Sequence, residues 1–402
     1  MPCIDNRFRF APLLAPALLV AALGCREDAT SPASREDGAA PALAASAGTA
    51  LAFYQMSASI HSCGVTTDNL AYCWGENTEG EVGDGTTIQR LTPVAVAGGL
   101  RFRQVSASFY HTCGITTDYR AYCWGSNFVG QLGDGTTTVH LTPVPVAGGL
   151  TFRQVTVGLS PHSCGVTYAD RQVYCWGGND NGQLGDGTTT TRLVPTAVAG
   201  GRQFRVVSAG GYHTCGVTTS NETFCWGSNR FGQIGDSSTA ILRRRPTRIA
   251  GGHLFRQVSA GWEHTCAVTT EDLAYCWGNG RDGQVGDGKT YLRFWPKAVR
   301  GGLSFGRVSA GFQHTCGETT TNQAYCWGDN FGGALGDGTY TARLTPVAVT
   351  GGLYFSQLSA GGGTCGVTPA SVAYCWGSNI YGQLGDGTTT DRLTPTPVAG
   401  PS

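Results

Sequence analysis

The sequence predicts an all-β fold, a seven-bladed β-propeller with four short strands in each blade. The main observation is a repeat, because a tryptophan in a Tyr-Cys-Trp-Gly-like segment recurs at Trp74, Trp124, Trp176, Trp226, Trp277, Trp327 and Trp376. Steps of about fifty residues indicate one supersecondary unit used many times. The composition agrees, with 61 glycines, 17 prolines and only 13% charged residues. Seven units fill residues 49–402.

Each unit predicts four strands, which in the second unit are Phe102–Ala107, His111–Thr116, Ala121–Trp124 and Pro143–Ala147. These short runs lie between Gly, Asn, Asp and Thr clusters, and no stretch has a sustained helical period. The first strand has small residues that suit the crowded centre. The last carries prolines, which cannot donate to a sheet ladder, so it belongs at the outer edge. We expect ring closure to place 51–58 and 395–399 in one blade or in adjoining blades; a parallel solenoid is the alternative.

Three motifs carry a resemblance to a known family. They are Gly-x-x-His (Gly210 to His213), Trp-Gly-x-Asn (Trp226 to Asn229) and Gly-Gln-Leu-Gly-Asp-Gly (182–187). Residues 49–400 resemble the regulator of chromosome condensation family of seven-bladed propellers. This resemblance implies the fold and says little about activity, because propellers host many functions.

Fourteen of the 16 cysteines form seven pairs, one in each repeat. A hairpin about Asp118 places Cys113 opposite Cys123 at a separation that a disulfide accepts. Zinc is the alternative, but three local ligands fall short of the usual four; free buried thiols are another. We therefore predict disulfides and no metal, and disulfides imply an oxidising compartment. The predicted pairs are Cys63 with Cys73, Cys113 with Cys123, Cys164 with Cys175, Cys215 with Cys225, Cys266 with Cys276, Cys316 with Cys326 and Cys365 with Cys375.

The N-terminus predicts export. Residues 1–25 have arginines before an apolar run from Phe10 to Leu23, which is short for a membrane span. The run ends Ala22-Leu23-Gly24-Cys25, which resembles a bacterial lipoprotein signal, although leucine is usual at the position of Ala22. We expect lipidation of Cys25; an ordinary cleaved signal is the alternative. Residues 26–48 read as a flexible tether.

Three patterns that could carry chemistry have simpler explanations. Residues 283–290 match the phosphate-loop pattern, but they lack the strand and helix that such a loop needs and align with a loop of every repeat. One aspartate per repeat, such as Asp134, predicts a hydrogen bond to the following backbone rather than a calcium site. A histidine before the first cysteine recurs in six repeats, whereas the seventh has Gly363 and is one residue shorter. We interpret this histidine as a structural hydrogen-bonding group rather than part of a ligand-binding ring. We expect no cofactor and no enzyme activity.

Candidate binding residues lie where the repeats differ. Before the histidine, aromatic residues replace small ones, and aromatic side chains are typical of binding hot spots. The candidates are Phe109, Tyr110, Tyr212, Trp262 and Phe312, and we expect their loops to meet near the axis at one end, with Phe128, Phe231, Phe331 and Tyr381 at the other. Arg243, Arg244 and Arg245 form a basic edge that could dock an acidic partner. Unconstrained turn tips and a solvated basic face are the alternatives.

These observations favour an exported, lipid-anchored propeller that binds another protein and catalyses nothing. The resemblance implies this too, because the family includes secreted bacterial proteins that bind and inhibit enzymes. Guanine-nucleotide exchange, the activity of the family's nuclear founder, is disfavoured by export and disulfides; a carbohydrate- or envelope-binding module is a third hypothesis. We expect the outer membrane or cell surface as the location, with full secretion as the alternative. We expect a monomer that meets the membrane only through its lipid and binds no nucleic acid.

Overall fold

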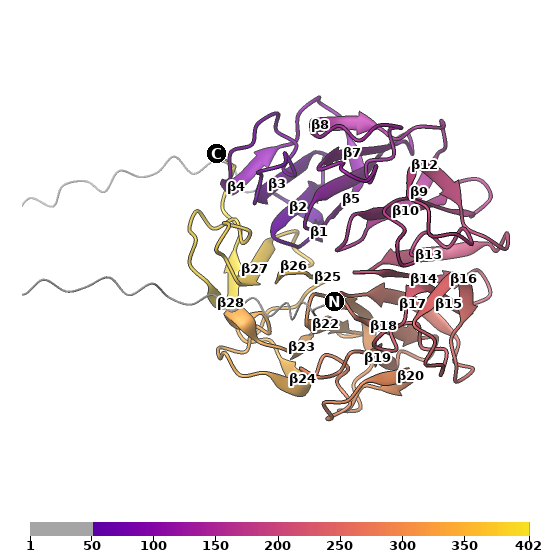
Figure 1. The fold of residues 1–402 in the computed structure, drawn as a ribbon. Helices are drawn as coiled ribbons and strands as arrows, with labels where there is room; N and C mark the ends of the chain where they lie inside the picture. The colour runs from indigo at the N-terminus through magenta and orange to yellow at the C-terminus, as the bar shows by residue number, and fades with distance from the viewer. Residues whose placement is uncertain (1–50, 402) are drawn as a thin grey trace, which may run out of the picture. The chain divides into compact units, whose positions relative to one another are not determined.

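The computed structural model describes residues 51–401, and these residues form seven four-stranded antiparallel sheets around a central axis. The colour in Figure 1 runs once around the ring, so that the first blade (indigo) lies beside the last (yellow). The innermost strands are β1 (Phe53–Ser57), β5 (Phe102–Ala107), β9 (Phe152–Val157), β13 (Phe204–Ala209), β17 (Phe255–Ala260), β21 (Phe305–Ala310) and β25 (Gln357–Ala360). The second strands are β2 (His61–Thr66), β6 (His111–Thr116), β10 (His162–Thr167), β14 (His213–Thr218), β18 (His264–Thr269), β22 (His314–Thr319) and β26 (Gly363–Val367).

The outer half of each blade follows in sequence order. The third strands are β3 (Ala71–Gly75), β7 (Ala121–Gly125), β11 (Val173–Gly177), β15 (Thr223–Ser228), β19 (Ala274–Gly278), β23 (Ala324–Gly328) and β27 (Ala373–Gly377). The outermost strands are β4 (Arg90–Ala95), β8 (His140–Pro145), β12 (Arg192–Ala197), β16 (Leu242–Arg248), β20 (Arg293–Ala298), β24 (Arg343–Ala348) and β28 (Arg392–Pro397). The one helical element among residues 51–401 is a single 3₁₀ turn, η1 (Phe331–Gly333).

The predicted fold class, blade number and strand order are confirmed. The outermost strand is displaced from its prediction, because β8 begins at His140 rather than Pro143. Its start pairs with Gly125 across a bulge, and Pro143 falls within that bulge. A proline that cannot donate to the ladder is tolerated at such a bulge on an edge strand.

The hydrophobic core lies in the seams, the contacts between one blade and the next. In the seam between the first two blades, Trp124 and Phe102 of blade 2 pack against Cys63 and Cys73 of blade 1. All seven repeat tryptophans are completely buried in this way. Each indole lies over a glycine of the preceding blade: a Cβ on Gly83, which has a positive φ, would come within 2.5 Å of the Trp124 indole nitrogen. This close approach explains why glycine recurs at that position.

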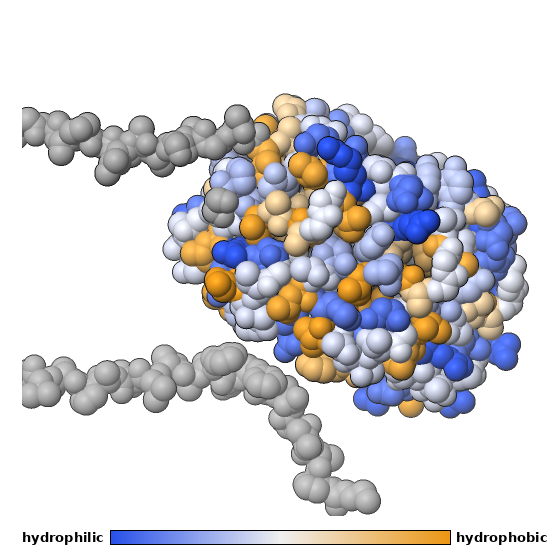
Figure 2. Space-filling view, turned by 90° about the horizontal axis from the view of Figure 1, so that it is seen from above, coloured by the Kyte–Doolittle hydropathy of each residue, from blue (hydrophilic) through white to orange (hydrophobic). Residues whose placement is uncertain are grey.

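Side chains of the innermost strands tie the ring together around a central cavity of about 280 Å³. Ser57 accepts a hydrogen bond from the backbone of Ala107 in the next blade at 2.9 Å, and the equivalent serine or threonine does so at every seam. The ring closes through Gln357 and Ser359 of blade 7, which bond to the backbone of Met56 and Ala58 in blade 1. The first and last segments of the propeller chain therefore lie in adjoining blades, as predicted. On the rim seen in Figure 2, hydrophobic and hydrophilic side chains are interspersed.

Candidate functional site

Strand order decides which loops share an end of the propeller. Successive antiparallel strands reverse direction, so the loops after the first and third strands of a blade lie at one end. The turns after the second strand and the links to the next blade lie at the other. We call the first end the aromatic face, because it carries all five aromatic residues that the sequence singled out.

Those five residues form one connected cluster. Phe109 of blade 2 contacts Trp262 of blade 5 and Phe312 of blade 6, with ring centroids 5.9 and 5.6 Å apart. Trp262 also lies 4.9 Å from Phe312 and 5.3 Å from Tyr212, and Tyr110 packs beside Phe109. Contacts between blades on opposite sides of the ring place the cluster over the axis. Tyr110 and Tyr212 remain 44% and 37% exposed at its edge.

One expectation about this face is wrong. Phe128, Phe231, Phe331 and Tyr381 do not lie at the opposite end, because they follow third strands and so share the aromatic face. Phe331 and Tyr381 line the same cavity as Phe109, and Phe231 lines another with Tyr212. Phe331 is 70% exposed and Phe128 is 66% exposed, so they extend the face outward from the central cluster.

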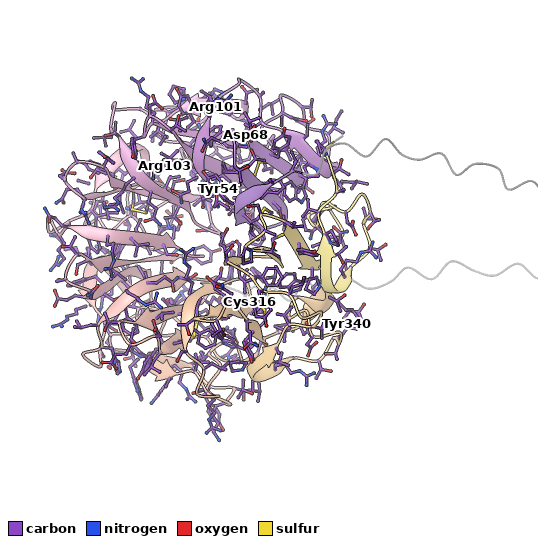
Figure 3. All side chains as sticks on the ribbon, turned by 180° about the vertical axis from the view of Figure 1, so that it is seen from behind. Tyr54, Asp68, Arg101, Arg103, Cys316 and Tyr340 are labelled. Carbon is purple, nitrogen blue, oxygen red and sulfur yellow. A yellow bond between two sulfur atoms is a disulfide. The ribbon has the colours of Figure 1, made fainter. Side chains whose placement is uncertain are left out.

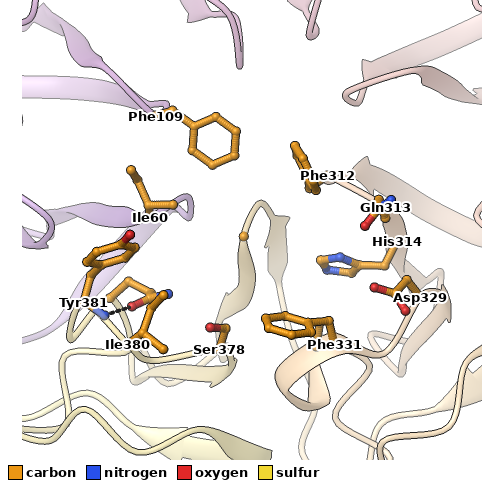
Figure 4. Close-up of a pocket in the computed structure, with 13 residues that line it drawn as sticks. Ile60, Phe109, Phe312, Gln313, His314, Asp329, Phe331, Ser378, Ile380 and Tyr381 are labelled. Atoms are coloured by element: carbon orange, nitrogen blue, oxygen red, sulfur yellow. Dashed lines mark hydrogen bonds between the residues drawn. The ribbon is translucent and has the colours of Figure 1, made fainter. Parts of the chain in front are cut away.

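A pocket of about 350 Å³ opens in this face between blades 6, 7 and 1, and we call it the seam pocket (Figure 4). Its walls are mainly apolar. The lining side chains include Ile60, Phe109, Phe312, Phe331, Ile380 and Tyr381, with polar groups from Gln313, His314, Asp329 and Ser378. In Figure 4, Phe109 and Phe312 lie at the top of the pocket and Ile380 and Phe331 at the bottom. The size falls within the range of small-ligand sites.

The irregular seventh repeat makes room for this pocket. Gly362 and Gly363 stand where the other repeats have a variable residue and a histidine, and Gly362 lines the cavity. Ala334 contributes a small wall where five other repeats have glutamine. The sequence analysis noted the missing histidine but did not infer a cavity. The feature of the sequence that could have indicated the cavity is the run of three glycines from Gly361 to Gly363. The corresponding loops of the other repeats carry larger side chains.

Carboxyl groups on the aromatic face are partly withdrawn from water. Burial raises the pKa of Asp329, and the nearby Asp282 carboxylate raises it further. Burial also raises the pKa of Glu263, which accepts a hydrogen bond from Asn279 at 2.9 Å. Near blade 1, burial raises the pKa of Glu81 to about 7. The face therefore combines aromatic rings with carboxyl groups whose negative charge is incompletely solvated.

The predicted arginines lie apart from the aromatic cluster, on the outermost strand β16 of blade 4. Arg243 pairs with Asp236 at 2.6 Å and donates to Ser238, so it has the same contact as Arg90 with Asp84 in blade 1. Arg244 and Arg245 are exposed and line a shallow groove. Arg243 also lines this groove, so all three arginines form the expected basic edge, which two strands separate from the axial loops.

The recurring aspartate has the predicted role and one that was missed. Asp84 accepts the backbone N–H of Thr86 at 2.9 Å, which is the expected turn contact. It also pairs with Arg90 at 2.6 Å. Although burial opposes ionisation, the Thr86 and Arg90 hydrogen bonds hold the pKa of Asp84 below its usual value. The signal that could have revealed this pair is an arginine six residues after the aspartate, or seven in blade 4, with His140 in its place in blade 2.

The six repeat histidines make the predicted structural hydrogen bonds. The Nε2 atom of His213 lies 2.8 Å from the hydroxyl of Thr265 in the next blade. That hydroxyl donates to the backbone carbonyl of Gln233, so its proton is used and Nε2 must carry its own. The Nδ1 atom of His213 is buried without a partner. Burial lowers the pKa of the imidazole to about 3, so it stays neutral and inaccessible.

All seven predicted disulfides are present, and each joins residues directly opposite in the second and third strands of its blade. The Cα atoms of Cys113 and Cys123, for example, are 4.0 Å apart. The sulfur atoms of these fourteen cysteines are therefore bonded to one another, as predicted. The bonds join Cys63 to Cys73, Cys113 to Cys123, Cys164 to Cys175, Cys215 to Cys225, Cys266 to Cys276, Cys316 to Cys326 and Cys365 to Cys375.

The phosphate-loop match at 283–290 is an ordinary repeat loop. It lies between the antiparallel strands β19 and β20, with no helix after it. The Lys289 N–H donates to Asp287, as the Thr86 N–H does to Asp84 in blade 1. The segment therefore has the turn contact of its counterparts rather than the geometry of a phosphate site.

The end opposite the aromatic face includes hydrogen bonds from arginine and tyrosine side chains to backbone carbonyls. Figure 3 labels Tyr54, Asp68, Arg101 and Arg103 there. The Tyr54 hydroxyl donates to the Arg103 carbonyl at 2.8 Å, and Arg101 donates to the Asp68 carbonyl.

The predictions for the N-terminus lie outside the described residues. They concern the signal, the lipidation of Cys25 and the tether. Within 51–401 no helix is long and apolar enough to cross a membrane.

Comparisons with known proteins agree with this architecture. The model of the RCC1-like domain matches residues 21–316, and models of the regulator of chromosome condensation (RCC1) repeat match 307–333 and 372–402. Ultraviolet-B receptor UVR8 of Arabidopsis thaliana is 30% identical over 234 residues, which are 57% of this chain and 41% of the receptor. Human E3 ubiquitin-protein ligase HERC2 is 44% identical over 59 residues, only 1% of that ligase. The chain thus matches less than half the length of these relatives.

Solved structures show the same fold. Human WBSCR16 superimposes with a TM-score of 0.74 at 20% identity, covering 82% of this chain and 94% of that one. Prp20p of Saccharomyces cerevisiae superimposes with a TM-score of 0.69 at 21% identity, covering 78% of this chain and 81% of Prp20p. The match to the RCC1-like domain model spans more than half of the chain and includes the whole of blades 1 to 5. This protein therefore belongs to the RCC1-like domain family.

Proposed function

We propose that this protein is an exported, lipid-anchored scaffold that binds another protein through its aromatic face and catalyses nothing. The observation that carries the proposal is the aromatic cluster over the axis together with the seam pocket. The cluster, and most of the side chains that line the pocket, depart from the repeat, whereas the buried contacts of the blades are repeated almost unchanged. Aromatic anchors beside a pocket, surrounded by polar groups, are typical of protein-binding hot spots.

Relatives support a protein as the ligand. The structure of Prp20p was described with its binding properties to Gsp1p and histones, and a structure of the same yeast protein is a complex with Kap60. Nucleotide exchange on a cytosolic GTPase is less compatible with this chain, because seven disulfides are typical of oxidising compartments. A carbohydrate- or envelope-binding role would use the same exposed rings.

Site-directed photo-cross-linking tests which face binds. A photoreactive amino acid replaces Phe331 on the aromatic face or, as the control, Tyr354 at the opposite end; the two side chains are 70% and 54% exposed. The full chain, produced in its own cells with its signal intact, should cross-link a protein from position 331 and not from position 354. Cross-linking from position 354 alone would contradict the proposal. Attachment to carbohydrate at 331 would favour the envelope-binding alternative.

Lipid anchoring is tested separately. Cys25→Ser removes the thiol that the signal presents for acylation. We expect the variant to move from the membrane fraction to the soluble fraction. Cys3→Ser, which removes the other cysteine that lies outside the seven repeat pairs, is the matched control and should leave the distribution unchanged. Retention of the Cys25→Ser variant in the membrane would contradict lipid anchoring.

A further inference from the structure

We propose that the seam pocket receives an arginine side chain of the partner protein. The aromatic rings pack against its methylene groups and its planar guanidinium group, and the Asp329 carboxylate pairs with its positive charge. This inference rests on the proposed function and specifies what the partner must present. It has three supports: the shape and chemistry of the walls, the charge in the pocket, and the position of the pocket in the repeat.

The walls suit a side chain with a long apolar stem and a flat head. Phe312 and Phe331 lie on the blade 6 side, and Ile380 and Tyr381 on the blade 7 side (Figure 4). Aromatic faces attract guanidinium groups through their quadrupole, and the methylene stem of arginine packs well on apolar surface. A volume of about 350 Å³ accommodates one such side chain.

The charge in the pocket is negative. Asp329 is the one acidic side chain in the wall, and no lysine or arginine lines it. Among residues 51–401, Asp329 forms no ion pair. His314, the one histidine in the wall, hydrogen-bonds to Thr364 at 2.9 Å, and burial lowers its pKa to about 4. It therefore supplies no positive charge, and a partner cation would find no competitor.

The seven repeats distinguish this site from an ordinary surface carboxylate. The position of Asp329 is Ser, Gly or Asn in five repeats and Glu76 in blade 1. Only the carboxylate in blade 6 lies beside the cavity that the seventh repeat leaves open. The Asp329 carboxylate, which most repeats lack, thus lies in the seam pocket of the aromatic face.

Two peptides test the proposal on the full chain with its disulfides intact. The probes are acetyl-Gly-Gly-Arg-Gly-Gly-amide and the same peptide with citrulline, which keeps the shape of arginine and removes its charge. Affinities are measured by nuclear magnetic resonance titration at low ionic strength. We expect the arginine peptide to bind at least about fivefold more tightly than the citrulline peptide. Asp329→Asn should abolish this preference, and the loop should tolerate it because Asn279 occupies the same position in blade 5.

Glu76→Gln removes the equivalent carboxylate of blade 1 and should leave the fivefold preference intact. Phe331→Ala should weaken both peptides. Equal affinities for the two peptides, tighter binding of citrulline, no detectable binding of either, or a preference that survives Asp329→Asn would each overturn the proposal. If the photoreactive group at position 331 still captures a protein in that case, the aromatic face binds its partner without an arginine anchor, and the proposed function stands.

Discussion

Six of the seven seams are nearly identical, and the seventh, which closes the ring, differs from them. In the six, a buried histidine donates to a hydroxyl of the next blade, as His213 does to Thr265. At the closing seam Gly363 replaces the histidine, while Ser62 and Trp74 still donate to the carbonyl of Gln383 at 2.9 and 3.0 Å. The tryptophan contact is thus present at every seam, whereas the histidine contact is absent from one. Its omission coincides with the seam pocket, so the closing seam has a cavity beside the place where the other seams have a structural contact.

The largest expected effect concerns the contact that all seams share. Trp226→Ala should lower the free energy of unfolding by about 3–5 kcal/mol, because a fully buried indole and its hydrogen bond to Gln183 are both lost. Trp74→Ala at the closing seam should cost a similar amount. Trp295→Ala, on an outermost strand and 44% exposed, is the control with little effect. Urea unfolding of the oxidised protein measures all three; a much smaller loss for Trp74→Ala would mean that the closing seam is already weak.

The contact that distinguishes the seams should have an intermediate effect. His213→Ala leaves the buried Thr265 hydroxyl without its donor and should cost about 1–3 kcal/mol of unfolding free energy. His140→Ala removes a partly exposed histidine that pairs with Asp134 and should cost less than about 1 kcal/mol. Equal losses in the two variants would show that the seam histidine has no special structural role.

Acid stability follows from the same histidines. Burial lowers their pKa to about 3 in His61, His111, His213 and His264 and to about 4 in His162 and His314, from 6.5 in the unfolded chain. Below about pH 6.5 the unfolded chain binds protons that the folded chain does not, so stability should fall as the pH drops toward 3. His213→Gln should make that fall less steep, as measured by unfolding at a series of pH values. An unchanged slope would mean that the imidazole is accessible to protons in the folded state.

The smallest effect is a gain in stability. Glu318 is buried in blade 6 at a position that is Val or Ile in the other six repeats, and burial raises its pKa to about 7. Between about pH 4.5 and 7 the folded chain keeps a proton that the unfolded chain has released. The contribution of this carboxyl group to the stability of the folded protein therefore falls as the pH rises. Glu318→Val should add about 1 kcal/mol at pH 8 and less at pH 4. A destabilised variant at both pH values would show that Arg307, 4.0 Å away, compensates the carboxylate.

Sequence reasoning predicted the blades well because their constraints are local and repeated. The cysteine pairs, the edge prolines and the aspartate turn each depend on neighbours within one blade, and seven copies make the pattern unambiguous. The five aromatic residues were also identified, because they break that pattern. The contact of Phe109 with Trp262 was not predicted, since it joins blades 2 and 5 across the axis.

The errors arose where one repeat was considered without its neighbours. Phe331 was assigned to the wrong end because strand direction was not followed through the blade. The ion pair of Arg243 with Asp236, which lies seven residues before it, was not predicted. The seam pocket requires side chains from three blades, so no single repeat encodes it.

The ring contacts of the aromatic cluster determine which residue is best suited to a binding test. Trp262 is a candidate binding residue, but its indole also packs against Tyr212, Phe109 and Phe312. We therefore expect Trp262→Ala to lower both the melting temperature and the affinity for a partner. Phe331, with 70% of its surface exposed, separates the two effects better.

The most direct test of the division between structural seams and a binding face measures affinity and melting temperature together in Phe331→Ala. The partner is the protein that is cross-linked from position 331. The account predicts that its affinity for the variant falls by about 2 kcal/mol while the melting temperature stays within about 1 °C of the unsubstituted protein. A variant that binds with unchanged affinity, or that melts several degrees lower with unchanged affinity per folded molecule, would contradict it.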